Sequence, residues 1–237
     1  MNILSIYQKT LNKLPIFDGL PTLLLRLYLA PVFIIAGFNK LNLSDPDVSG
    51  LANLLANDNI VQWFGNTQWG LGLPLPTLLA NLAAWSEFAG GWLLLIGLLT
   101  RFVSIPLMVT MVVAMTSVHA PNGWFAITPT NPDTSPAKVL SWLGVDAAKA
   151  SLQNSEAAGK RLTKMRELLT DNGNTDWLYE KGPIVVLNNG IEFAATYFVM
   201  LLVLVFMGGG RFTSVDYYIK RWFSQNSDAF SRVGKVN

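Results

Sequence analysis

Ionisable residues lie inside long apolar runs of this chain, where a charge is costly. Arg26, Glu87 and Glu192 each interrupt such a run. A charge at mid-membrane costs on the order of 3 kcal/mol or more, so these side chains normally face a protein interior and pair or exchange protons. The depth of each residue below the inner membrane surface is estimated from a rise of about 1.5 Å per residue. By this estimate, the long side chain of Arg26 can reach Glu87. The sequence therefore predicts a buried Arg26–Glu87 ion pair, which either takes part in function or only fixes helix packing.

A second group of polar residues is expected at the outer end of the same helices. His119, the sole histidine, ends one apolar run, and Asn188 and Glu192 share a helical face at i and i+4. An imidazole that titrates near neutral pH beside a carboxyl group can relay protons to a bound redox carrier. We predict that His119 and Glu192 are catalytic, in an outer pocket completed by Asn188 and Lys40. The alternative is that His119 is an interfacial side chain without a catalytic task.

Composition limits the chemistry that the chain can perform. None of the 237 residues is cysteine, which excludes disulfides, Cys-ligated zinc and iron–sulfur clusters. Met108 and Met115 share a helical face with His119 and are soft ligands for Cu(I), but methionine also fills apolar helices, so we predict no metal site. The formal net charge of +2, without a basic stripe, argues against nucleic-acid binding. Redox chemistry would therefore need a bound cofactor or a partner.

Membrane-spanning helices are the elements that must position these residues. Of the chain, 51% is hydrophobic and 14% is charged, whereas soluble domains carry about 25% charged residues. About 20 apolar residues cross a bilayer. The sequence predicts an all-α fold, a polytopic membrane four-helix bundle that contacts the lipid bilayer as a single membrane domain, residues 1–237. Its predicted spans are residues 20–41, 75–99, 102–118 and 184–207.

Basic residues concentrate on one side of the predicted spans. Residues 42–74, between the first two spans, contain three aspartates and no lysine or arginine. Short loops that retain lysine and arginine stay in the cytoplasm, so the basic side is predicted to be cytoplasmic and to hold both termini. The basic residues beside the spans on that side include Lys9, Lys13, Arg101 and Arg211.

Two segments outside the spans are expected to form amphipathic helices. Ile3, Leu4 and Tyr7 recur at helical spacing near Lys9, as in a helix that lies on the inner membrane surface. Residues 120–183 connect the third and fourth spans and contain apolar residues at helical spacing before Asn172 and Gly173, which end helices. We predict that this connection, the outer cap, is a partly helical extracytoplasmic structure; the alternative is a solvated linker.

The spans resemble those of the DoxX family of four-helix bacterial inner-membrane proteins. The resemblance implies a location in the bacterial cytoplasmic (inner) membrane, with polar positions at Arg26, Lys40, Glu87, Arg101 and Arg211. Most members have a shorter connection after the third span, so the chain is similar to a subgroup that carries an outer cap. The matching pieces are residues 26–41 (RLYLAPVFIIAGFNKL), residues 87–101 (EFAGGWLLLIGLLTR), the end of the third span at His119, and residues 208–216 (GGGRFTSVD).

A redox-linked role follows from the same resemblance, because some relatives form the quinone-reactive membrane subunit of a thiosulfate-oxidising complex. We therefore expect the bundle to bind or reduce a quinone, as a quinone-interacting oxidoreductase subunit, with Lys40, Asn188 and Trp124 contacting the quinone. Apolar helices bordered by a few polar groups suit an isoprenoid quinone. The alternative function is a noncatalytic membrane anchor or accessory partner of a periplasmic or secreted protein, bound through the outer cap.

Overall fold

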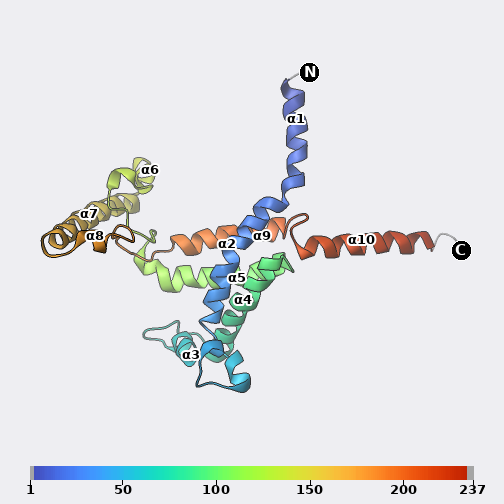
Figure 1. Ribbon diagram of the computed structural model, residues 1–237, viewed down its shortest axis with the longest axis horizontal. Helices are drawn as coiled ribbons and strands as arrows, with labels where there is room; N and C mark the ends of the chain where they lie inside the picture. Colours follow the sequence, from blue (N-terminus) through green and yellow to red (C-terminus); the bar gives the residue numbers. More distant parts are fainter. Residues whose placement is uncertain (1–2, 234–237) are drawn as a thin grey trace. The chain divides into compact units, whose positions relative to one another are not determined.

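The computed structural model describes residues 3–233, and these fold into two compact units. The first unit is drawn from Met1–Val113 and Thr196–Asn237, and the second is Ala114–Ala195. Figure 1 shows a chain built from helices, and the only β structure among the described residues is two isolated bridges. The α-helices are α1 (Ile3–Lys13), α2 (Gly19–Phe38), α3 (Asp58–Gly65), α4 (Pro76–Ile96), α5 (Thr100–Val113), α6 (Ala137–Trp142), α7 (Asp146–Asn172), α8 (Thr175–Leu178), α9 (Glu192–Met207) and α10 (Val215–Val233).

Three helices in the described part of the chain are long and apolar enough to cross a membrane. They are α2, α4 and the continuous helix Thr100–Asn122, which begins with α5. Local sequence explains the bounds of α4, because Pro76 suits the first helical turn and Gly97 adopts φ 71° at the end. The predicted all-α polytopic membrane fold is therefore confirmed, and the predicted spans at residues 20–41, 75–99 and 102–118 overlap these three helices.

The predicted fourth span differs from the observed helix. Helix α9 starts at Glu192 and has 16 residues, which cover about 24 Å of the roughly 30 Å hydrocarbon core. Before it, Asn189 adopts a φ of 57°, and Leu187 forms an isolated β-bridge. The asparagine and glycine residues at 188–190 stop a helix from extending further back, so the predicted start at Ile184 is wrong.

Helices α2 and α4 pack side by side in the first unit (Figure 1). A Cβ atom added at Gly37 of α2 would lie 2.7 Å from the Cα atom of Phe88, and one added at Gly91 of α4 would lie 2.8 Å from the backbone nitrogen of Ile34. The two helices are therefore antiparallel and touch through their backbones. Small residues allow this close approach in membrane helices, where packing rather than the hydrophobic effect drives association.

Gly37→Ala is expected to lower the free energy of unfolding by about 1–3 kcal/mol. The added methyl group would collide with the backbone of α4 at Phe88, which can move away only if the whole helix shifts. Gly90→Ala is the matched control: its methyl group would meet side chains of Val103 and Leu107 at 3.2 Å and 3.5 Å, and we expect a change of less than about 1 kcal/mol. Unfolding in mild detergent followed by circular dichroism measures both. Equal losses in the two variants would contradict the backbone contact.

The segment between α2 and α4 folds over one end of this helix pair. Leu41 and Ala56 form a β-bridge, and the backbone N–H of Asn57 donates to the carbonyl oxygen of Lys40 at 2.8 Å. Apolar residues of the segment complete a small core with α4. Its buried members are Leu41, Ala56, Phe64, Ala80 and Ala84.

The second unit contains the helices α6, α7 and α8. Helix α7 ends at Asn172 and is followed by Gly173, as the sequence predicts. One face of α7 is buried, and the remaining faces carry exposed ion pairs such as Lys160–Glu156. The hydrogen bond from Lys160 lowers the pKa of Glu156. Exposed pairs of this kind contribute little to stability, so packing of the apolar face holds α7 in place. The buried residues of that face are Ala148, Ser155, Ala158 and Leu162.

Candidate functional site

Lys40 and Glu87 form an ion pair within the first unit. Lys40 follows the end of α2, and Glu87 lies near the middle of α4. The Nζ atom of Lys40 donates to Oε2 of Glu87 and, at 3.4 Å, to the carbonyl oxygen of Ala36. The Glu87 side chain is 6% exposed and the Lys40 side chain is 25% exposed. A buried carboxylate is thus joined to a cation that remains partly accessible.

Aromatic rings lie next to this ion pair. The ring of Phe88, which follows Glu87 in α4, is 6.2 Å from the ring of Phe38 and 5.9 Å from that of Trp85. The indole N–H of Trp85 donates to the carbonyl oxygen of Leu54 at 2.8 Å. Leu54, in the segment after α2, is thus linked to an aromatic cluster, defined as Phe38, Trp85 and Phe88, whose members lie within two residues of Lys40 or Glu87 in the sequence.

Arg26 is completely buried and binds backbone carbonyl groups. Its Nη1 atom donates to the carbonyl oxygens of Leu94 at 3.3 Å and Leu95 at 3.1 Å, and Nη2 donates to that of Thr213 at 2.7 Å. Leu94 and Leu95 belong to the last turn of α4, where carbonyl groups have no N–H partner four residues further along the helix, although the carbonyl oxygen of Leu94 also accepts from the backbone N–H of Gly97. The negative end of the helix dipole also favours a cation there, so Arg26 completes the end of α4.

These contacts correct the predicted Arg26–Glu87 pairing, although both residues are buried. Glu87 and Leu94 are separated by about 10 Å along α4 at 1.5 Å per residue. Arg26 binds the carbonyl groups at the end of α4, whereas Lys40 reaches Glu87 from beyond the end of α2. Counting depth along single helices predicts how deep each charge lies but does not predict in which direction its side chain points.

Asp216 caps α5 from a distant part of the chain. Its Oδ1 atom accepts from the backbone N–H of Leu99 at 2.7 Å, and Oδ2 accepts from that of Thr100 at 2.9 Å. The carboxylate satisfies N–H groups that have no partner at the start of a helix. Sequence reasoning missed this role, as it missed Thr213. The sequence signal that could have indicated these roles is the run 213–216, shortly after the three glycines at 208–210. This run contains residue types that cap helices.

In the second unit, Asn188 and Glu192 bind the backbone of residues 122–126. The side-chain amide of Asn188 donates to the carbonyl oxygen of Phe125 at 2.8 Å. The Oε2 atom of Glu192 accepts from the backbone N–H of Ala126 at 2.9 Å. Both side chains therefore join the start of α9 to the segment that follows the third span.

His119 lies in the same cluster, at the end of a π-helical segment, Ala114–His119. Its Nδ1 atom is 2.8 Å from the carbonyl oxygen of Asn189. Because a carbonyl group only accepts, Nδ1 carries the proton in a neutral ring, and Nε2 is then the atom that can take up a proton. Wide helical turns of this kind often occur at functional sites.

The second unit thus gathers three of the predicted site residues, His119, Asn188 and Glu192. Trp124 belongs to the same unit and is 54% exposed. Lys40 belongs to the first unit, where its described partner is Glu87. A pocket that joins Lys40 to His119 stays a prediction.

Residues 22–120 match the family model DoxX. The matched range contains the three long apolar helices almost completely, together with Arg26, Lys40, Glu87 and His119. The outer cap and α9 lie beyond it. No curated protein and no solved structure matches the chain.

Proposed function

We propose that this multi-pass membrane protein, whose residues 22–120 match the DoxX family model, binds a membrane quinone beside the Lys40–Glu87 ion pair. The observation that carries the proposal is this pair of titratable groups, one buried and one partly exposed, in a largely apolar helix pair. In the proposal, a quinone carbonyl oxygen accepts from Lys40, and a quinol hydroxyl donates to Glu87. Such groups can exchange protons with a redox carrier inside the membrane.

The aromatic cluster is a reason to expect a ligand with a flat ring. Phe38, Trp85 and Phe88 pack against one another within two residues of Lys40 or Glu87 in the sequence, and flat ligands pack well against aromatic side chains. A site with few polar groups and many apolar ones is typical of small-molecule binding. The isoprenoid tail of a quinone would remain in the lipid around the helices.

Quinone titration of the purified protein tests the proposal. A short-chain ubiquinol analogue, the reduced form whose hydroxyl group donates to Glu87 in the proposal, is added to the protein in mild detergent, and binding is measured by isothermal titration calorimetry. Glu87→Gln removes the titratable group but can still accept from Lys40, so we expect a folded protein with at least about tenfold weaker binding, the loss of one charge-assisted hydrogen bond. The matched control is Glu156→Gln, on the exposed face of α7.

Two results of this titration would rule out the proposal. The first is that the unchanged protein binds no quinol, and the second is that Glu87→Gln and Glu156→Gln bind equally well. The catalytic roles predicted for His119 and Glu192, with Asn188 and Trp124 as quinone contacts, form a separate proposal. His119→Ala in the same titration tests it, because this variant removes the imidazole while the first unit is unchanged, and equal binding by His119→Ala and the unchanged protein would contradict it.

A noncatalytic accessory role is the second candidate function, and exposed apolar residues of the second unit favour it. Trp142 is 72% exposed and Leu143 is 75% exposed at the end of α6. Contiguous exposed apolar residues often mark interaction sites. A defined protein that copurifies with the chain, and is lost when residues 133–176 are deleted, would favour this role over quinone binding.

A further inference from the structure

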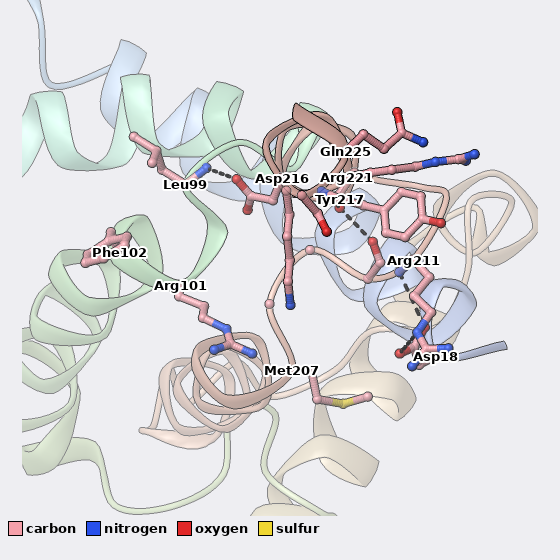
Figure 2. A pocket seen from close by; sticks show the side chains of 16 residues that line it. Asp18, Leu99, Arg101, Phe102, Met207, Arg211, Asp216, Tyr217, Arg221 and Gln225 are labelled. Atoms are coloured by element: carbon pink, nitrogen blue, oxygen red, sulfur yellow. Dashed lines mark hydrogen bonds and ion pairs between the residues drawn. The ribbon is translucent and has the colours of Figure 1, made fainter. Parts of the chain in front are cut away.

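A cavity lies in the first unit around the glycine turn that follows α9. Its volume is about 770 Å³, and its walls come from the start of α5, the glycines at 208–210 and the first turns of α10. Figure 2 shows the guanidinium group of Arg101 on one side of this cavity and the pair formed by Arg211 and Asp18 on another. The cavity is separate from the Lys40–Glu87 pair, and no residue of that pair lines it.

Positive charge is in excess in this cavity. Four basic side chains line it, Arg101, Arg211, Lys220 and Arg221, together with the carboxylates of two aspartates. Both carboxylates are engaged: one caps the start of α5, and the other lies 3.3 Å from the Nε atom of Arg211. Within the described residues, no carboxylate lies within ion-pair distance of Lys220 or Arg221. The cavity therefore has cations available for an anionic ligand.

Apolar surface adjoins these cations. Leu99, Phe102 and Met207 line the cavity and are 51%, 73% and 46% exposed. Helix α10 also exposes large apolar side chains, among them Trp222 and Phe223 at 59% and 61%. A helix with basic and aromatic residues of this kind is typical of the membrane interface. A ligand that suits the whole site would have an anionic head and an apolar tail.

We infer that this cavity binds the phosphate group of an anionic phospholipid. Basic pockets beside membrane helices bind acidic lipid headgroups, since the phosphate meets lysine and arginine while the acyl chains stay in the bilayer. Arginine offers paired donors to phosphate oxygens, and lysine adds a mobile charge. A free phosphate ion shares the headgroup chemistry, but it would leave the apolar rim of Leu99, Phe102 and Met207 without a partner.

Neutralising two of the cations tests this lipid site. Lys220→Gln with Arg221→Gln removes two exposed charges from the cavity wall. The matched control is Lys160→Gln with Arg161→Gln, since the same Lys-Arg pair occurs on α7 outside the cavity. Phosphatidylglycerol is titrated into the full-length protein in neutral detergent, and lipid-bound species are measured by native mass spectrometry. We expect about 30-fold weaker binding for the cavity variant, from two charges near a headgroup, and unchanged binding for the control.

Titrations with two further ligands distinguish a lipid headgroup from a free phosphate ion. Phosphatidylcholine is expected to bind more weakly than phosphatidylglycerol, and inorganic phosphate at equal concentration is expected not to displace the lipid. Displacement by inorganic phosphate would show a free-anion site and overturn the lipid assignment. Equal loss of binding in the cavity variant and the α7 control would show general charge attraction and overturn the site itself. Unfolding midpoints without lipid, expected to be unchanged, confirm that both variants fold.

Discussion

Arg26→Met is expected to lower the free energy of unfolding by about 3–5 kcal/mol, since removing a buried charged partner leaves desolvated polar groups behind. Methionine keeps much of the side-chain length but has no donor. The carbonyl groups of Leu94, Leu95 and Thr213 would then lose the guanidinium that binds them. Because Thr213 follows the glycine turn, the variant should also loosen the connection between α4 and the start of α10.

Unfolding in lipid-free detergent, followed by circular dichroism, measures the effect of Arg26→Met. Arg101→Met is the matched control within the first unit. The Arg101 side chain is exposed and donates to one carbonyl oxygen, that of Phe206, at 2.9 Å. We expect it to cost about 1 kcal/mol or less. A similar loss in both variants would mean that the buried hydrogen bonds of Arg26 contribute little.

Lys40→Met and Glu87→Leu are each expected to cost about 3 kcal/mol, because either change leaves one member of a buried pair without its partner. The double variant is expected to lose less than the sum of the two by about 1–3 kcal/mol. The reason is that an apolar pair in the same place has no unpaired charge to bury. The unchanged protein, the two single variants and the double variant form a double-mutant cycle. Its coupling free energy is measured by chemical unfolding in detergent.

Strict additivity in this cycle would contradict a direct Lys40–Glu87 interaction. A large coupling free energy, by contrast, would show that the pair holds α2 against α4. The cycle measures stability only, and it therefore complements the quinone titration. Glu87→Gln is suited to the titration because an amide still accepts from Lys40, whereas Glu87→Leu is suited to the cycle because it removes every polar contact.

The sequence by itself determines which segments enter the membrane. Hydropathy and length over α2, α4 and the helix Thr100–Asn122 depend only on local composition, so these spans were predictable. The burial of Arg26 and Glu87 was predictable for the same reason, since a charge inside an apolar span must face protein. The end of α7 at Asn172 follows from the asparagine and glycine there.

Tertiary structure alone decided which of these residues meet. The backbone contact at Gly37 and Gly91 sets how α2 and α4 align, and that alignment places Lys40, rather than Arg26, at Glu87. Pairing between distant segments also moved the start of the predicted fourth span from residue 184 to residue 192. The run 184–187 is apolar enough for a helix, yet Leu187 pairs with Ile127 in a β-bridge. Local patterns carry no information on these contacts, because their partners are set by packing between segments far apart in the chain.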